Sequence, residues 1–272
     1  MNSKINTVVL IDLLFLLLLL ISGSFDNKII SNVIYYSAFI IPIAIGIFAI
    51  KKTDSSSDEK SIGFAVAKED VGFSLPLFAP TVILVLGISL LFTFIMGKLG
   101  LSSSANYDEP LLLCVVLHAV LPSMLEELLF RYIPLKLLSQ HGCGYALILS
   151  SVMFAFAHAS VFQILHPLVA GIIFGFITLS TKSILPAIIL HLLNNTLSLI
   201  LMKTNGAFRY SIIAVLLIIG IISVAVIITN KERYRTAISS VFTFTEERHT
   251  YSPLIFIGAS FCIALTNLLL TN

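Results

Sequence analysis

The segment Ser-Met-Leu-Glu-Glu-Leu-Leu-Phe-Arg, residues 123–131, places three ionisable side chains in a strongly apolar part of the chain, and residues 110–122 before it carry no charge. An ionisable group at membrane depth costs about 2.5 kcal/mol or more, so such groups are rare there and usually functional. On a helix Glu127 and Arg131 lie one turn apart on one face, whereas Glu126 points about 100° away. We therefore expect Glu127 to pair with Arg131 and Glu126 to remain available for chemistry. The alternative is a helix end at the headgroups, where all three side chains are solvated.

The composition indicates a protein that crosses a membrane several times. Of its 272 residues, 58% are hydrophobic and 11% are charged, and the mean hydropathy is +1.04. A soluble domain has about twice that charged fraction. The net charge of +2 suggests no nucleic-acid partner. The three cysteines lack the spacing of a metal site and are interpreted as packing residues.

Apolar segments along the chain predict an all-α fold, a polytopic transmembrane helical bundle of about 8–9 spans. A helical span needs about 20 apolar residues. The predicted spans are residues 8–22, 29–50, 75–96, 109–138, 145–160, 164–180, 184–202, 211–229 and 253–270. The basic segment after the eighth span is assigned to a loop. We divide the chain into N-terminal transmembrane helices (1–105), a core that holds the ionisable segment 123–131 (106–203) and C-terminal transmembrane helices (204–272).

The basic residues predict the orientation of these spans. With nine spans and a cytoplasmic N-terminus, 12 of the 16 Lys and Arg residues fall on the cytoplasmic side. This asymmetry follows the positive-inside rule. The count places Arg131 and Lys136 at the cytoplasmic interface, at the end of the long fourth span. The expected location is therefore a multi-pass position in a membrane, with the N-terminus in the cytoplasm.

Polar side chains on three predicted helices are expected to face one hydrated cavity. Glu126 lies on the fourth helix and His158 on the fifth, while His191 and Asn195 lie one turn apart on the seventh. Unpaired polar groups are expensive in lipid, so their convergence is the economical arrangement. A single histidine in a membrane helix is often only a hydrogen-bonded packing residue. His166, near a span end, is assigned to the membrane interface.

Such a cavity holds groups suited to hydrolysis by an activated water molecule. A desolvated glutamate can act as a general base, a histidine can share its proton, and a second histidine and an amide can stabilise an oxyanion. The candidate set Glu126, His158 and His191 can instead hold Zn²⁺, and intramembrane Glu and His also serve proton-coupled transport. Each histidine is alone on its helix, without a His-Glu-x-x-His pair. We therefore expect no cofactor, with zinc as the alternative.

Three motifs in order resemble the signature of the CPBP family, which includes the CAAX prenyl endopeptidases and the bacteriocin-processing and self-immunity proteins called Abi proteins. The motifs are Glu126-Glu127-x-x-x-Arg131, Phe154-x-x-x-His158 and His191-x-x-x-Asn195. The resemblance covers about residues 108–200. It extends to Gly171-x-x-x-Gly175 and the loop 181–186, where Lys182 stands at a position that is usually Gly in the family.

The resemblance implies an intramembrane endopeptidase that hydrolyses a peptide bond of a membrane-associated protein or peptide. Its partners would be membrane lipid and that substrate. Family roles carry over to six residues: Glu126 with His158 activates water, His191 and Asn195 stabilise the oxyanion, and Glu127 and Arg131 support them. The alternatives are a non-catalytic CPBP-like membrane scaffold or immunity protein and, less favoured, a proton-coupled transporter.

Overall fold

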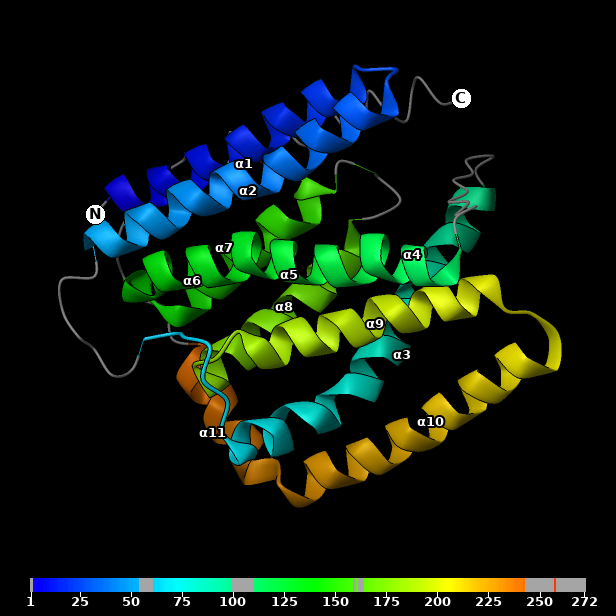
Figure 1. Cartoon of the computed structure of the whole chain (residues 1–272). Coiled ribbons are helices and arrows are strands. Elements are labelled where there is room, and N and C mark those ends of the chain that lie inside the picture. The colour runs from blue at the N-terminus through cyan, green and yellow to red at the C-terminus, as the bar shows by residue number, and fades with distance from the viewer. Residues whose placement is uncertain are drawn as a thin grey trace.

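The computed structural model describes residues 2–53, 61–98, 110–158, 160, 164–242 and 257. Within these ranges the regular structure is helical apart from one isolated bridge between Gly63 and Ser183, so the predicted all-α class is confirmed (Figure 1). Six helical segments there are long and apolar enough to cross a membrane: Ser3–Gly23, Lys28–Lys52, Lys68–Lys98, Leu111–His141, Leu185–Lys203 and Gly206–Thr229. The predicted span 253–270 lies outside the described residues, apart from residue 257.

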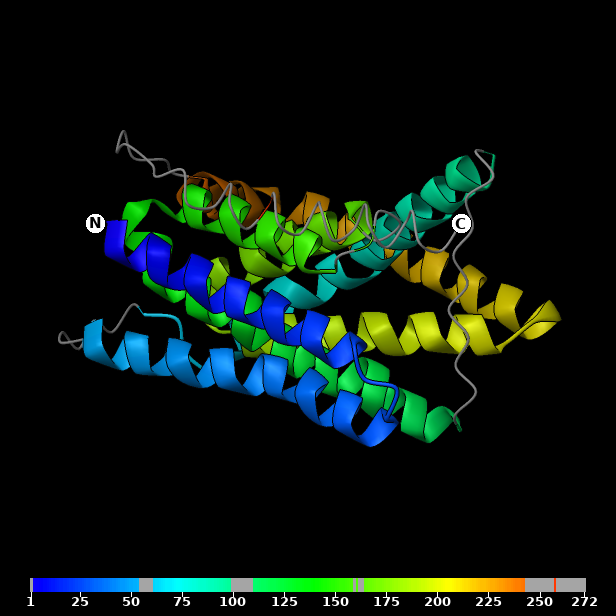
Figure 2. The ribbon, with the colours of Figure 1, turned by 90° about the horizontal axis from the view of Figure 1, so that it is seen from above.

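The bundle is arranged around the segment Leu111–His141. Helices α1 (Asn2–Gly23) and α2 (Lys28–Thr53) run antiparallel and cover one side of it (Figures 1 and 2). Helix α9 (Leu185–Lys203) contacts its first half, while α3 (Lys68–Lys98) packs against α9 and against α10 (Gly206–Thr229). The polar segment 123–131 therefore lies between two groups of apolar helices.

Two shorter helices, α7 (Cys143–Ala157) and α8 (Leu165–Thr181), complete the interior. They pack against each other, and α7 also contacts α6 (Ile133–Leu138). The sequence predicts both as spans because they are apolar. In the structure, burial in protein is a second reason why α7 is apolar. Two-thirds of its residues are buried, among them Leu147, Met153 and Phe154.

The segment Leu111–His141 is a continuous helix with two wide π-helical turns. It consists of α4 (Leu111–Val115), η1 (Val116–Val120), α5 (Leu121–Glu127), η2 (Leu128–Tyr132), α6 and the 3₁₀ turn η3 (Ser139–His141). Each π turn ends two residues before a proline, Pro122 or Pro134. Proline has no N–H, and its ring clashes with the carbonyl four residues earlier, so a wide turn at this place relieves the clash.

The second proline leaves a carbonyl that another helix satisfies. Pro134 cannot donate to the carbonyl of Phe130 because it lacks an N–H. The hydroxyl of Ser150, on α7, donates a hydrogen bond to this oxygen at 2.7 Å. Ser150 is fully buried, so the bond ties α7 to the long helix next to the glutamate pair. Glu126 and Glu127 thus lie at the end of a short α-helical stretch between two π turns.

Close packing of α7 and α8 depends on the two glycines that the sequence singles out. A Cβ added at Gly171 would lie 3.2 Å from the Cα of Ser151, and one added at Gly175 would lie 2.5 Å from Cδ1 of Leu147. Small residues four apart allow helices to approach in this way. These two glycines therefore let α7 and α8 pack closely.

The turn between α8 and α9 is held to the segment before α3. Gly63 donates its N–H to the carbonyl of Lys182 at 3.0 Å and accepts from the N–H of Ile184 at 3.0 Å. Lys182 has φ = 55°, in the left-handed region that favours glycine. The structure therefore explains why Gly is usual at this position in the CPBP family, and why Lys there requires its neighbours to fix the backbone.

Two predictions about basic residues are wrong. The segment after α10 is a helix, α11 (Lys231–Val241), where a loop was predicted. Its Tyr234 is buried and donates to the carbonyl of Phe73 at 2.9 Å, and Arg233 donates to that of Glu69 at 2.6 Å. The segment is amphipathic and docks on α3, which begins at Lys68, earlier than predicted. Arg131 is fully buried and does not reach the interface.

The packing of α7 against α8 makes a testable prediction. We expect Gly171→Ala to lower stability by about 1–3 kcal/mol, because the new methyl group meets the backbone of Ser151, which cannot rotate away. Gly87→Ala in α3 is the matched control: nothing lies within 4 Å of its Cβ position, so we expect equal or slightly higher stability. SDS titration followed by circular dichroism measures both. Equal stabilities for the two variants would contradict the predicted tight contact.

Candidate functional site

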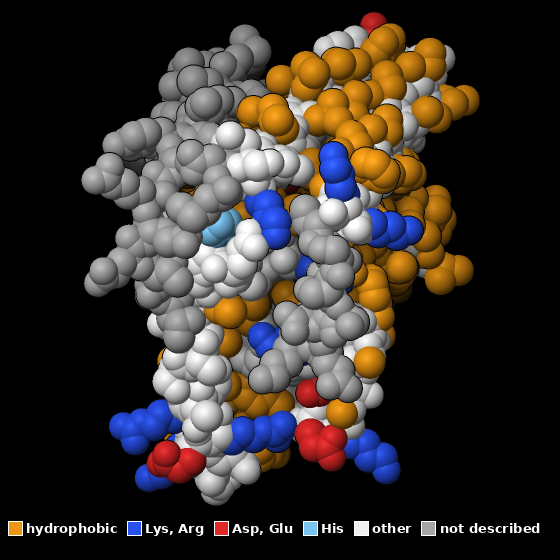
Figure 3. All heavy atoms as spheres, turned by 90° about the vertical axis from the view of Figure 1, so that its left-hand side faces the viewer, with side chains coloured by type: hydrophobic (Ala, Val, Ile, Leu, Met, Phe, Trp, Pro, Cys, Tyr) orange, Lys and Arg blue, Asp and Glu red, His pale blue; other side chains and the backbone are white. Residues whose placement is uncertain are grey.

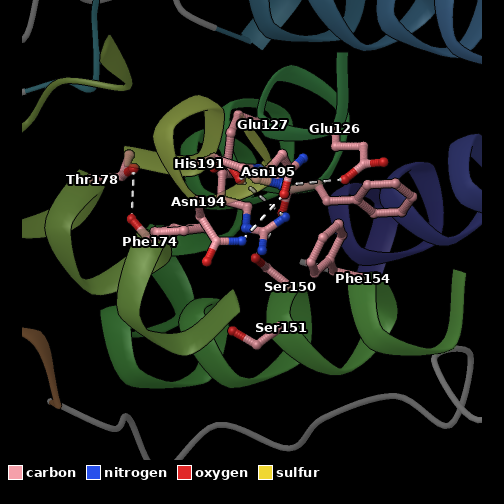
Figure 4. A network of polar contacts seen from close by, with 12 residues as sticks. Glu126, Glu127, Ser150, Ser151, Phe154, Phe174, Thr178, His191, Asn194 and Asn195 are labelled. Carbon is pink, nitrogen blue, oxygen red and sulfur yellow. Dashed lines mark hydrogen bonds and ion pairs between the residues drawn. The ribbon is translucent and has the colours of Figure 1, made fainter. Parts of the chain in front are cut away.

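The four residues predicted to converge line one cavity. Its volume is about 340 Å³, and its walls include Glu126 from α5, His158 at the end of α7, and His191 and Asn195 from α9. The geometric expectation of one cavity shared by three helices is therefore confirmed, and Figure 4 shows the side chains of Glu126, His191 and Asn195 close together. The roles of these residues stay a prediction.

His191 is fixed between the two adjacent glutamates. Its Nδ1 lies 2.8 Å from Oε1 of Glu127, and its Nε2 lies 3.8 Å from Oε2 of Glu126. The ring stacks on Phe174, with centroids 5.1 Å apart and planes 27° apart. A carboxylate can only accept, so Nδ1 carries a proton and donates to Glu127. The other nitrogen, Nε2, is thereby directed at the cavity.

Glu127 and Arg131 form the predicted pair, with 3.5 Å between Oε1 and a guanidinium nitrogen, and both side chains are fully buried. The alternative of a solvated helix end is therefore wrong. The guanidinium carbon of Arg131 lies 3.7 Å from the ring centroid of Phe154, in cation–π geometry. Glu127 does more than the sequence predicts: it neutralises Arg131 and also holds His191, 64 positions away in the chain.

His158 is oriented by the helix that it ends. Its Nδ1 lies 3.0 Å from the carbonyl of Phe154, which can only accept, so this nitrogen is the protonated one in the neutral ring. Nε2 then has a free lone pair. The ring also meets that of Phe154 edge-on, at 4.8 Å between centroids. The motif Phe154-x-x-x-His158 thus sets both the tautomer and the direction of the imidazole.

Glu126 is the more accessible of the two carboxylates. Its side chain is 16% exposed, whereas that of Glu127 is fully buried. Its Oε2 lies 3.8 Å from Nε2 of His191. This separation exceeds hydrogen-bond length, so a water or substrate atom can interact with both groups. The predicted division between a paired and an available glutamate agrees with this arrangement.

The structure adds residues to the cavity that the sequence analysis did not select. They are His118, Pro122, His166, Asn194 and Ser198. His166, which the sequence assigns to the membrane interface, also lines the cavity. A signal for His118 was present: with Pro122 and Glu126 it forms a series spaced by four residues, so the three share a helix face. Asn194 donates from Nδ2 to Oδ1 of Asn195 at 3.2 Å, which leaves the amide nitrogen of Asn195 available.

The geometry also bears on zinc. In the ranges that the structure describes, no three His, Cys, Asp or Glu side chains are grouped as ligands of one metal ion. Glu126, His158 and His191 line the same cavity without forming such a group. The residues present therefore do not fit a zinc ion in this arrangement. The dependence of activity on metal stays a prediction.

Comparison with known proteins locates the similarity in this part of the chain. Residues 108–197 match the family model described as Type II CAAX prenyl endopeptidase Rce1-like. A Bacillus subtilis (strain 168) protein named "Putative membrane peptidase YdiL" is 27% identical over 154 residues, which are 56% of this chain and 62% of that relative. The chain thus spans less than two-thirds of the relative that it matches. No solved structure matches the chain.

The buried pair makes the second prediction. We expect Glu127→Gln to lower stability by about 3–5 kcal/mol, because Arg131 is left buried without a counter-charge. Adding Arg131→Met should restore most of this stability, since the uncompensated charge is removed. Glu126→Gln is the matched control and should stay close to the wild type. Unfolding in SDS measures all four proteins; a double variant less stable than Glu127→Gln would contradict the interpretation.

Proposed function

Residues 108–197 of this chain belong to the CPBP family, and from this premise we propose that the protein is an intramembrane endopeptidase of the glutamate type. It would hydrolyse a peptide bond of a membrane-associated protein or peptide, with water activated by Glu126 and His158. The observation that carries the proposal is the orientation of His191: a fully buried Glu127 holds one ring nitrogen and directs the other toward Glu126 across the cavity. If His191 only filled space in the bundle, it would not need a carboxylate at each of its ring nitrogens.

The first chemical step is attack by water. Glu126 accepts one proton of the water as its oxygen bonds to the carbonyl carbon of the substrate, and His158 can share this proton through its unprotonated Nε2. The resulting oxyanion accepts hydrogen bonds from Nε2–H of His191 and from the amide nitrogen of Asn195. For this donation His191 must be an imidazolium. The carboxylate of Glu127, 2.8 Å from Nδ1, stabilises that charge.

The second step breaks the peptide bond. As the tetrahedral intermediate collapses, the carbon–nitrogen bond breaks and the nitrogen takes the proton held by Glu126 and His158, so that an amine leaves. The carboxyl product keeps the oxygen from water. No external oxidant or reductant is needed, and the starting protonation states are regained. The same two groups therefore act as base and then as acid.

The exposed basic residues support an orientation for this enzyme. We propose a bacterial cell-membrane location with the N-terminus in the cytoplasm. The end of the bundle that holds α11, the start of α3 and the end of α2 carries many Lys and Arg side chains (Figure 3). At the opposite end the described chain has Lys28, Lys98, Lys203 and Arg209. The positive-inside rule places the more basic end in the cytoplasm, even when buried Arg131 is left out of the count.

The test of catalysis is Glu126→Gln, which removes the base and keeps the shape. We expect peptide hydrolysis to fall by about 10²–10⁴-fold while the unfolding midpoint is nearly unchanged. Glu232→Gln, at an exposed site on α11, is the matched control and should retain activity. Membrane peptides from cells that produce each variant are compared by mass spectrometry. A peptide product present with wild type and Glu232→Gln but absent with Glu126→Gln identifies the substrate; identical peptide profiles would favour a non-catalytic scaffold.

Metal dependence is tested on the purified active protein. We expect full activity after exhaustive treatment with a chelator, because the proposed base is a carboxylate and the described residues form no group of three metal ligands. Elemental analysis should find no stoichiometric zinc. Stoichiometric zinc, with activity lost on its removal and restored on its return, would contradict the proposal. Inhibition by added zinc would agree with it, since a metal bound at the cavity blocks Glu126.

A further inference from the structure

A second cavity adjoins the proposed catalytic groups on the side of α1 and α2. Its volume is about 220 Å³, and its lining includes Glu126 and His158, which also line the larger cavity. Its other lining residues are aliphatic or aromatic: Phe15, Leu19, Tyr35, Phe39, Phe130, Phe154 and Ala157. The second cavity therefore begins at the reacting groups and ends in an apolar wall.

The wall of the second cavity is built from rings in mutual contact. The centroid of Phe15 lies 4.9 Å from that of Phe39 and 5.4 Å from that of Phe130. The centroid of Phe130 in turn lies 5.6 Å from that of Phe154. The Phe154 ring also makes the cation–π contact with Arg131 and the edge-on contact with His158. Interlocked aromatic rings keep a defined shape, because moving one displaces its neighbours. The second cavity is therefore suited to distinguishing between bound groups by their size.

The dimensions favour a small occupant. Pockets for drug-sized ligands have volumes of about 300–1,000 Å³, and the second cavity, at about 220 Å³, is smaller than these and than the adjoining polar cavity. The occupant must fill this space while the carbonyl carbon of the cleaved bond lies beside Glu126. It must therefore be attached to the substrate backbone next to that carbon. A single large side chain meets both conditions. A charged side chain does not, since the wall beyond Glu126 and His158 offers no counter-charge.

We propose that the second cavity is a specificity pocket, which receives one large apolar side chain of the substrate, aromatic or branched aliphatic, adjacent to the bond that is cut. This inference rests on the proposed endopeptidase function and names the residue class that it selects. Four of the seven apolar lining residues come from α1 and α2, which lie outside residues 108–197. Leu19 of α1 is the specificity-determining residue best placed for a test, because it is only partly buried and can be enlarged.

The first experiment fills the pocket. Leu19→Trp is compared with wild type and with Leu20→Trp, an adjacent substitution on a side chain that is 46% exposed and does not line the cavity. Purified proteins in lipid nanodiscs are given a set of peptides derived from the wild-type product, with Phe, Leu, Ala or Asp on either side of the cut. We expect wild type and Leu20→Trp to prefer Phe or Leu at one position by about 10- to 100-fold in kcat/KM.

Leu19→Trp should weaken or remove this preference. Its kcat/KM for the Phe and Leu peptides should fall at least tenfold, while that for the Ala peptide stays near the wild-type value. An equal fall for all peptides, or no change for any, would overturn the specificity pocket. So would a wild-type enzyme that cleaves Ala and Asp peptides as well as Phe peptides.

A binding measurement separates this inference from the catalytic proposal. The chain contains no tryptophan, so Phe39→Trp in the Glu126→Gln background gives one fluorescent reporter in the pocket wall. We expect its emission to shift with peptides carrying Phe or Leu, but not with Ala or Asp peptides of equal length. This shift without any hydrolysis by the wild type would retain the pocket and reject the endopeptidase. If hydrolysis depends on Glu126 and no shift occurs, the pocket is rejected and the endopeptidase stands.

Discussion

The carboxylate of Glu127 is the interaction on which the site depends. It is fully buried, and its Oε1 contacts both Arg131 and His191. A buried charge without partners is strongly unfavourable, so neither Glu127 nor Arg131 can be accommodated alone. Their pairing also fixes two distant parts of the chain, because the bond to His191 joins α5 to α9. One desolvated ion pair thus sets the position of the imidazole that faces Glu126.

The backbone of the long helix allows two adjacent glutamates to have different environments. On a helix, neighbouring side chains diverge by about 100°, so one can face a partner while the other faces a cavity. The π turns on either side, each followed by a proline, adjust how the flanking turns meet α7 and α9. The bond from Ser150 to the carbonyl of Phe130 then ties the second π turn to α7. The different accessibilities of Glu126 and Glu127 follow from this local geometry together with the surrounding helices.

Much of the candidate site could be predicted from the sequence, because polar residues in apolar helices have few alternatives to facing one another. Spacing within a helix predicted the pairing of Glu127 with Arg131. It could not reveal that Glu127 also binds His191, since that contact depends on how two helices pack. The contribution of His166 to the cavity could not be predicted for the same reason: its nearness to a span end says nothing about which helices lie around it. The helix α11 was missed because it is short and rich in charge, and its stability depends on docking Tyr234 against α3.

The division of labour between segments follows from where each contact lies. The polar groups that would do the chemistry all belong to residues 108–197, the part that matches the family model. The apolar wall beside Glu126 comes partly from the same range, through Phe130, Phe154 and Ala157, and partly from α1 and α2. A change in α1 can therefore alter the shape of the space next to the reacting groups without touching the ion pair that orients His191. The proposed catalytic groups are constrained by buried charges, whereas the shape of the apolar wall is constrained by the packing of aromatic rings. The reaction and its selectivity can therefore change independently.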